Sequence, residues 1–121
     1  MRFLILLVSF ASLLVPLTPV PAPGQVASSP PGDVEKGKQL FMNRGCFQCH
    51  NTVAQGGRSG PRLAPRPVPF SAFTALVRQP INQMPPYTTE VMSDGEIADI
   101  YAFLLTIPPP PPVSTIPILN R

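Results

Sequence analysis

The sequence contains no tryptophan, a single histidine and only two cysteines. Cys46 and Cys49 are three residues apart, so they cannot form a disulfide that closes a long loop. A structural zinc site normally uses four Cys and His ligands, and this chain would have to recruit carboxylates to complete one. Because His50 is the only histidine, an iron site with two histidine ligands is excluded.

The chain also has little excess charge: it contains nine Lys and Arg residues and six Asp and Glu residues, and its net charge is +3. This small excess gives no case for nucleic-acid binding. The hydrophobic run over residues 3–15 is too short to span a bilayer comfortably, and prolines follow it. We interpret residues 1–28 as a secretory signal cleaved after Ser28 or Ala27, with an uncleaved membrane anchor as the alternative. In both cases we expect the rest of the chain to be exported to the periplasm.

Proline, in contrast, is abundant. The 19 prolines cluster at 16–31, 61–69 and 108–112. We divide the exported part into a linker at 29–32, a domain at 33–107 and a Pro-rich tail at 108–121. A domain of about 75 residues is marginal without a disulfide, a metal or a cofactor. A buried cofactor would supply the missing stabilisation.

Helical periodicity is visible in the first half of this domain. Asp33 can cap a helix over 33–44, which Gly45 would end. A shorter helix is expected over 71–79. Its inward side chains are expected to be Phe73, Leu76 and Val77. The loop over 51–69 has no apolar periodicity, and loops of that length are usually functional.

The last helix has the clearest pattern. Ser93 and Glu96 form a capping box at its start. The apolar stripe that follows comprises Ile97, Ile100, Tyr101, Leu104 and Leu105. Pro108 cannot continue the helix. The expected fold is therefore all-α, with three to four short helices.

Residues Cys46 to His50 read Cys-Phe-Gln-Cys-His, the attachment motif of c-type haem. Two thiols at this spacing can each bond one vinyl group at the porphyrin edge, and the next residue directs an imidazole nitrogen at the iron. A zinc site, a thioredoxin-like dithiol and two unremarkable thiols are the competing interpretations. The dithiol would need a strand–helix setting, whereas this motif follows a predicted helix. We therefore predict one covalently bound haem c.

The sixth iron ligand is then a methionine, water or nothing. Met42 precedes the motif on the incoming helix and cannot reach across the ring. Met92 adjoins the cap of the last helix, where a core role suits it. Met84 lies in a loop with proline on both sides, and a stiff loop loses little entropy when it presents a weak thioether ligand. We predict Met84 as the ligand, with Met92 as the alternative.

At this point the sequence resembles the class I cytochromes c, and the resemblance covers residues 32 to about 107. The landmarks that carry it are residues 32–41, 46–50, 59–63, 83–87 and 96–104. It implies a small class I cytochrome c fold around the haem, in which the first and last helices cross near Gly37. It also implies that Phe41 and Tyr101 pack at this crossing.

The resemblance further implies roles around the haem. The Pro61 carbonyl is expected to accept a hydrogen bond from His50, and Leu63 is expected to pack on the haem face. Tyr87, in the Met84 loop, is expected to contact the cofactor. Larger members hold a buried propionate with Trp and Tyr; here Arg62 or Arg66 would substitute.

An iron held by His50 and Met84 has no open position, so the expected function is single-electron carriage rather than catalysis. The alternative is a dedicated haem subunit of a dehydrogenase or oxidase; a haem enzyme or gas sensor is less favoured. The expected partners are a redox donor and acceptor, with no nucleic acid, and the protein is expected to be a monomer. Association with a membrane or an enzyme complex stays open. A basic rim at Arg58, Arg62 and Arg66, and the apolar tail, are candidate docking features.

Overall fold

The computed structural model describes residues 29–119; the predicted signal at 1–28 and the last two residues lie outside them. The α-helices are α1 (Val34–Asn43), α2 (Cys46–His50), α3 (Phe70–Arg78) and α4 (Asp94–Thr106), followed by the 3₁₀ turns η1 (Val113–Thr115) and η2 (Pro117–Leu119). The described residues contain no strand, which confirms the predicted all-α fold. Within them, no helix has the length and apolar character needed to cross a membrane.

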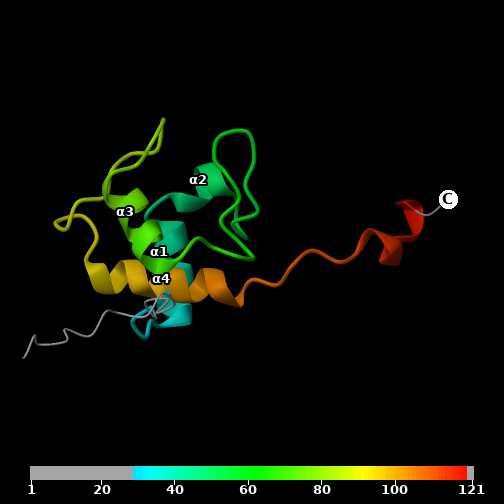
Figure 1. Ribbon diagram of the computed structural model, residues 1–121, viewed down its shortest axis with the longest axis horizontal. Coiled ribbons are helices and arrows are strands. Elements are labelled where there is room, and N and C mark those ends of the chain that lie inside the picture. Colours follow the sequence, from blue (N-terminus) through cyan, green and yellow to red (C-terminus); the bar gives the residue numbers. More distant parts are fainter. Residues whose placement is uncertain (1–28, 120–121) are drawn as a thin grey trace, which may run out of the picture.

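The domain is built on the crossing of α1 and α4 (Figure 1). Gly37 is buried at this crossing, and a Cβ atom there would overlap the Asp99 carbonyl group and lie 2.9 Å from the Ile100 nitrogen. Only glycine lets the two backbones approach this closely. The predicted crossing near Gly37 is confirmed.

Asp99 joins the two helices on the polar side of this crossing. It accepts the Asp33 N–H at 2.8 Å and pairs with Lys36 at 2.8 Å. Asp33 in turn caps α1 by accepting the Lys36 N–H. Burial alone would raise the pKa of Asp99, but the bonds from Lys36 and Asp33 outweigh it and hold the pKa below its usual value.

The aromatic rings of the core contact one another in two groups. The ring of Phe41 contacts Phe103 with centroids 5.6 Å apart. Tyr101 instead packs against Phe70 and Phe73, at 5.2 and 5.4 Å. Phe41 on α1 therefore packs across the crossing against α4 as predicted, whereas the ring contacts of Tyr101 are with α3; both side chains belong to the core.

The predicted burial of two apolar side chains, Leu105 and Leu76, is wrong. Leu105 is 55% exposed, and Phe103 is buried in its place. Leu76 on α3 is 39% exposed, because it faces the cleft described below and not the core. The capping box of α4 and the other inward positions of α3 and α4 are as predicted.

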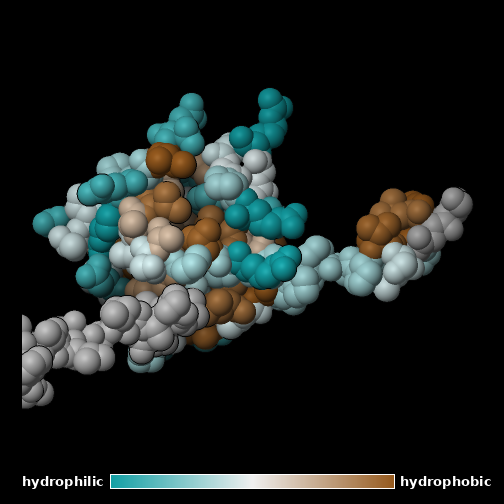
Figure 2. Space-filling model, in the orientation of Figure 1, coloured by the Kyte–Doolittle hydropathy of each residue, from teal (hydrophilic) through white to brown (hydrophobic). Residues whose placement is uncertain are grey.

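The C-terminal tail leaves the helices as an extended segment, and η1 and η2 lie at its far end (Figure 1). Apolar side chains gather there (Figure 2), and Val113, Ile118 and Leu119 are 59–70% exposed. A tail folded back over the domain is not the arrangement of this structure. At the start of the tail, Pro108 and Pro110 line a small cavity with the loop after α2.

Candidate functional site

The site begins at the turn between α1 and α2. Gly45 has φ +80°, a left-handed conformation that glycine adopts without a steric penalty, and it redirects the chain after α1. One helical turn then carries Cys46, Cys49 and His50, which the sequence predicted as a turn but not as a helix of its own. The two thiols are free.

His50 is buried with 7% exposure and has one fixed hydrogen bond. Its Nδ1 lies 2.8 Å from the Pro61 carbonyl oxygen. Since a carbonyl can only accept, Nδ1 carries the proton and Nε2 keeps its lone pair for another ligand. This is the contact that the resemblance implied, and it fixes both the tautomer and the ring orientation.

A cleft of about 1330 Å³ opens beside this turn, larger than the 300–1,000 Å³ usual for small-molecule sites. The loop after α2 and the loop between α3 and α4 lie on the same side of the crossed helices (Figure 1), and both contribute to its walls. The apolar residues that line it include Leu63, Phe73, Leu76, Val77, Met84, Ile97 and Ile100. Cys46, Cys49 and His50 line the same cleft.

The methionines are placed differently. Met84 is half-buried and lines the cleft. Met92 also reaches the cleft, but it is only 2% exposed and belongs to the core, as its core role predicted. Met42 is partly buried and packs against the core. Met84 packs only against the edge of the core, so of these three residues it is the half-buried methionine that lines the cleft.

Tyr87 lies beside the first cysteine. Its hydroxyl donates to the Arg44 carbonyl at 2.7 Å, and it also contributes to the surroundings of Cys46. Burial raises the pKa of the Cys46 thiol, and burial likewise raises the pKa of Tyr87. Tyr87 therefore anchors the loop that carries Met84 against the turn that carries Cys46.

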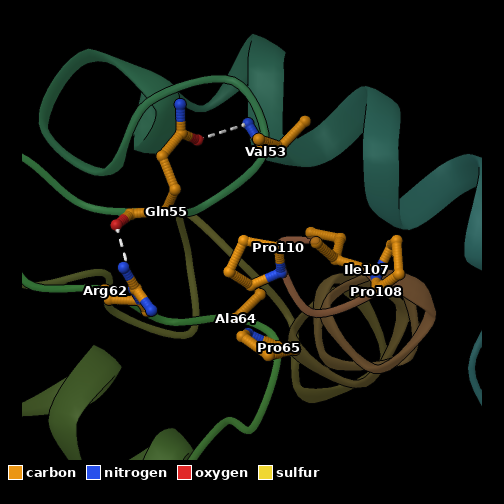
Figure 3. A pocket seen from close by; sticks show the side chains of 8 residues that line it. All are labelled: Val53, Gln55, Arg62, Ala64, Pro65, Ile107, Pro108 and Pro110. Atoms are coloured by element: carbon orange, nitrogen blue, oxygen red, sulfur yellow. Dashed lines mark hydrogen bonds between the residues drawn. The ribbon is translucent and has the colours of Figure 1, made fainter. Parts of the chain in front are cut away.

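The two arginines expected near a propionate are exposed and line the cleft. Arg62 donates from Nε to the Gln55 carbonyl at 3.4 Å, so part of its guanidinium is engaged with its own loop (Figure 3). It also lines a cavity of about 150 Å³ on the side of the tail (Figure 3). Arg66 faces the cleft without such an engagement among the described hydrogen bonds.

Sequence reasoning missed Arg78. Its Nη1 donates to the Tyr87 and Met92 carbonyls, each at 2.7 Å, and its Nη2 pairs with Asp94. The only sequence signal was a basic residue in the last turn of α3, before Pro80. The acceptors are mainly backbone carbonyls, which no sequence pattern identifies.

The donor set distinguishes between the possible cofactors. Within residues 29–119 no cluster of three or more His, Cys, Asp and Glu side chains could hold a metal ion. Two thiols on one turn, an imidazole with a free Nε2 and a large apolar cleft fit a covalently attached haem.

The fold and these donors together define a small c-type cytochrome domain of class I. Residues 32–104 match the family model described as cytochrome c oxidase, cbb3-type, subunit III, and the chain belongs to this family. No solved structure matches the chain significantly. The match spans α1 through most of α4, so it includes the whole cleft and stops before the tail.

Proposed function

We propose that this chain is a periplasmic single-electron carrier with one haem c, attached through Cys46 and Cys49, and with His50 and Met84 as axial ligands. The observation that carries the proposal is that His50, whose Nδ1 is bonded to the Pro61 carbonyl, and Met84 line one cleft together with the two cysteines. When bound, a haem ligated in this way supplies a one-electron couple of relatively high potential.

The residues of the chain perform three tasks for this couple. His50, oriented by Pro61, supplies a strong ligand whose tautomer cannot change without loss of that hydrogen bond. Met84 would be the second residue that holds the iron, and with both ligands in place the chemistry supplied would be outer-sphere electron exchange and not substrate binding at the metal. The apolar residues that line the cleft, including Leu63 and Phe73, would give the bound macrocycle apolar surroundings. We therefore propose an electron-transfer role and no catalytic one.

The c-type cytochrome domain and the predicted signal at residues 1–28 both support export of the chain. Domains of this type are typically exported, so we place the mature chain in the periplasm, as a monomer that exchanges electrons with a donor and an acceptor protein.

A second candidate is a dedicated haem subunit of an oxidase complex. The matching family is described by an oxidase subunit, and the Pro-rich tail carries exposed apolar side chains away from the domain. Both candidates use the same site and differ in whether the chain stays bound to its acceptor. Co-purification of an oxidase with the native protein would favour the second.

The ligand assignment is tested with a matched pair of variants. Met84→Leu and Met92→Leu both exchange a thioether for a side chain of similar size, a change that usually costs less than about 1.5 kcal/mol. Met84→Leu should lose the weak far-red band of the ferric protein, which reports the sulfur–iron bond, and its potential should fall. Met92→Leu should keep both. The reverse result would refute Met84 as the ligand, and intact mass should show one haem in each variant.

A further inference from the structure

The guanidinium group of Arg78 bonds the loop that carries Met84 at two backbone carbonyls. We define the Met84 loop as residues 79–93, between α3 and α4. It contains no helix, and Ile81 near its tip is 70% exposed. A loop of this kind needs anchors if it is to present one side chain in a fixed position.

Arg78 provides such an anchor at the start of the loop. Its Nη1 bonds the carbonyls of Tyr87 and Met92, in the middle and near the end of the loop, and its Nη2 bonds Asp94 at the start of α4. The side chain is only 18% exposed. A guanidinium is charged at all relevant pH values and offers several donors in one plane, so it can hold these three acceptors at once.

The contact with Tyr87 matters most for Met84, which lies three residues earlier. Tyr87 is fixed at three atoms. Its N–H donates to the Val77 carbonyl at 3.0 Å, its carbonyl accepts from Arg78, and its hydroxyl donates to Arg44. Pro85 and Pro86 separate it from Met84 and restrict the intervening backbone. Because this backbone is stiff, fixing Tyr87 also restricts where Met84 can lie.

We propose that Arg78 is a positioning residue that holds the Met84 loop closed and thereby sets how firmly Met84 occupies the axial position. This inference rests on the proposed ligation by Met84. A thioether is a weak ligand, so the balance between bound and released Met84 depends on the conformational freedom of the loop. Without Arg78 the loop loses two carbonyl contacts and becomes less restrained. The state in which Met84 is released then has the higher conformational entropy and is favoured more.

The test compares Arg78→Gln and Arg78→Lys with Arg44→Gln in the haem-loaded protein. Arg44 is the control because its side chain forms an ion pair with Glu96, while the backbone carbonyl that accepts the Tyr87 hydroxyl is kept in the variant. Two properties of the ferric protein are measured: the pH at which the far-red sulfur–iron band disappears and the affinity for added imidazole. Both report displacement of Met84.

We expect Arg78→Gln to lower the pH midpoint by about one unit and to bind imidazole about tenfold more tightly, since it loses charge-assisted bonds. Arg78→Lys keeps the charge but loses the planar set of N–H donors. Its pH midpoint and its imidazole affinity should therefore lie between those of Arg78→Gln and the wild type. Arg44→Gln should match the wild type in both properties. Arg78→Lys is the deciding variant if Arg78→Gln does not accumulate.

The outcomes separate this inference from the proposed function. If the wild type itself lacks the sulfur–iron band, ligation by Met84 is refuted. If the wild type has the band, and the Arg78 variants melt earlier with an unchanged midpoint and imidazole affinity, Arg78 is only structural and the inference is overturned.

Discussion

Replacing Gly37 with alanine adds one methyl group at the point where α1 and α4 touch. The new Cβ would overlap the Asp99 carbonyl group, which belongs to the backbone of a packed helix and cannot rotate away. The two helices would have to separate or slide. Because Phe41 and Ile97 are completely buried in the same interface region, such a shift also disturbs the core.

The magnitude follows from two opposing effects. Alanine has the higher helix propensity, which favours the variant by about 1 kcal/mol. Overpacking typically costs about 1–3 kcal/mol, and a clash with main-chain atoms lies at the upper end of that range. The net loss is then about 2 kcal/mol, which corresponds to a melting temperature lower by about 8–16 °C for a domain of this size. Gly37→Leu should cost still more.

The assay is thermal unfolding of the haem-loaded protein, followed by helical circular dichroism. Gly95→Ala is the matched control, since it lies in the first turn of α4 and the nearest atom to its added Cβ is the Ser93 hydroxyl oxygen, at 3.9 Å. It should melt at or slightly above the wild-type temperature. If Gly37→Ala melts like Gly95→Ala, the close crossing does not limit stability and the reasoning is wrong.

Two further predictions concern charge. The folded-state pKa of Asp99 is lowered, so this carboxylate stabilises the fold above the unfolded pKa of about 3.9, and the stabilisation is lost as the pH falls through the folded pKa. Asp99→Asn should therefore unfold at a lower urea concentration than the wild type at neutral pH. In strong acid the two proteins should unfold at the same urea concentration. Arg58 and Arg66 are exposed and line the cleft. Replacing both with Glu should slow second-order electron transfer with an acidic redox protein and reduce the dependence of this rate on salt concentration. Lys38→Glu is the control, because Lys38 does not line the cleft, and it should change neither quantity. Unchanged rates and salt dependence in the double variant would exclude a basic docking rim.

The parts of the fold that sequence predicted best are those with local physical signals. Asp33 and the Ser93–Glu96 box mark helix starts because side-chain oxygens accept the free amides there, and both caps are present in the structure. The cysteine–histidine turn is defined by spacing alone, and it lies at the cleft as its chemistry requires. Gly37 was also placed correctly, by the resemblance.

The errors arise where a position depends on several neighbouring elements. Helix α4 is buried on most of its circumference, so its periodicity does not select one face, and Phe103 rather than Leu105 is inside. Leu76 has the spacing of a core residue but faces the cleft, a space that sequence does not reveal. Arg78 was missed because the carbonyls that it bonds lie 9 and 14 residues further along the chain.

The tail gives the last prediction, and the structure decides where it should be cut. Pro108 and Pro110 line the small cavity behind the loop after α2, together with Ala64 and Pro65 (Figure 3), so they support the part of the chain that positions Pro61 and His50. Beyond them the chain runs through Pro112 into η1 and η2, where Val113, Ile118 and Leu119 are exposed. Removing the far part of the tail therefore differs physically from removing all of it.

Two truncations separate these effects. A chain ending at Pro112 should keep the haem spectrum and melting temperature of the full chain, while its co-purification with a redox partner should weaken, because the stiff proline segment no longer presents an apolar docking element. A chain ending at Ile107 should in addition melt earlier, since it also loses the cavity wall formed by Pro108 and Pro110. A clear loss of thermal stability already at Pro112 would show that the distal tail belongs to the fold. Unchanged co-purification would show instead that it is a frayed end without a partner.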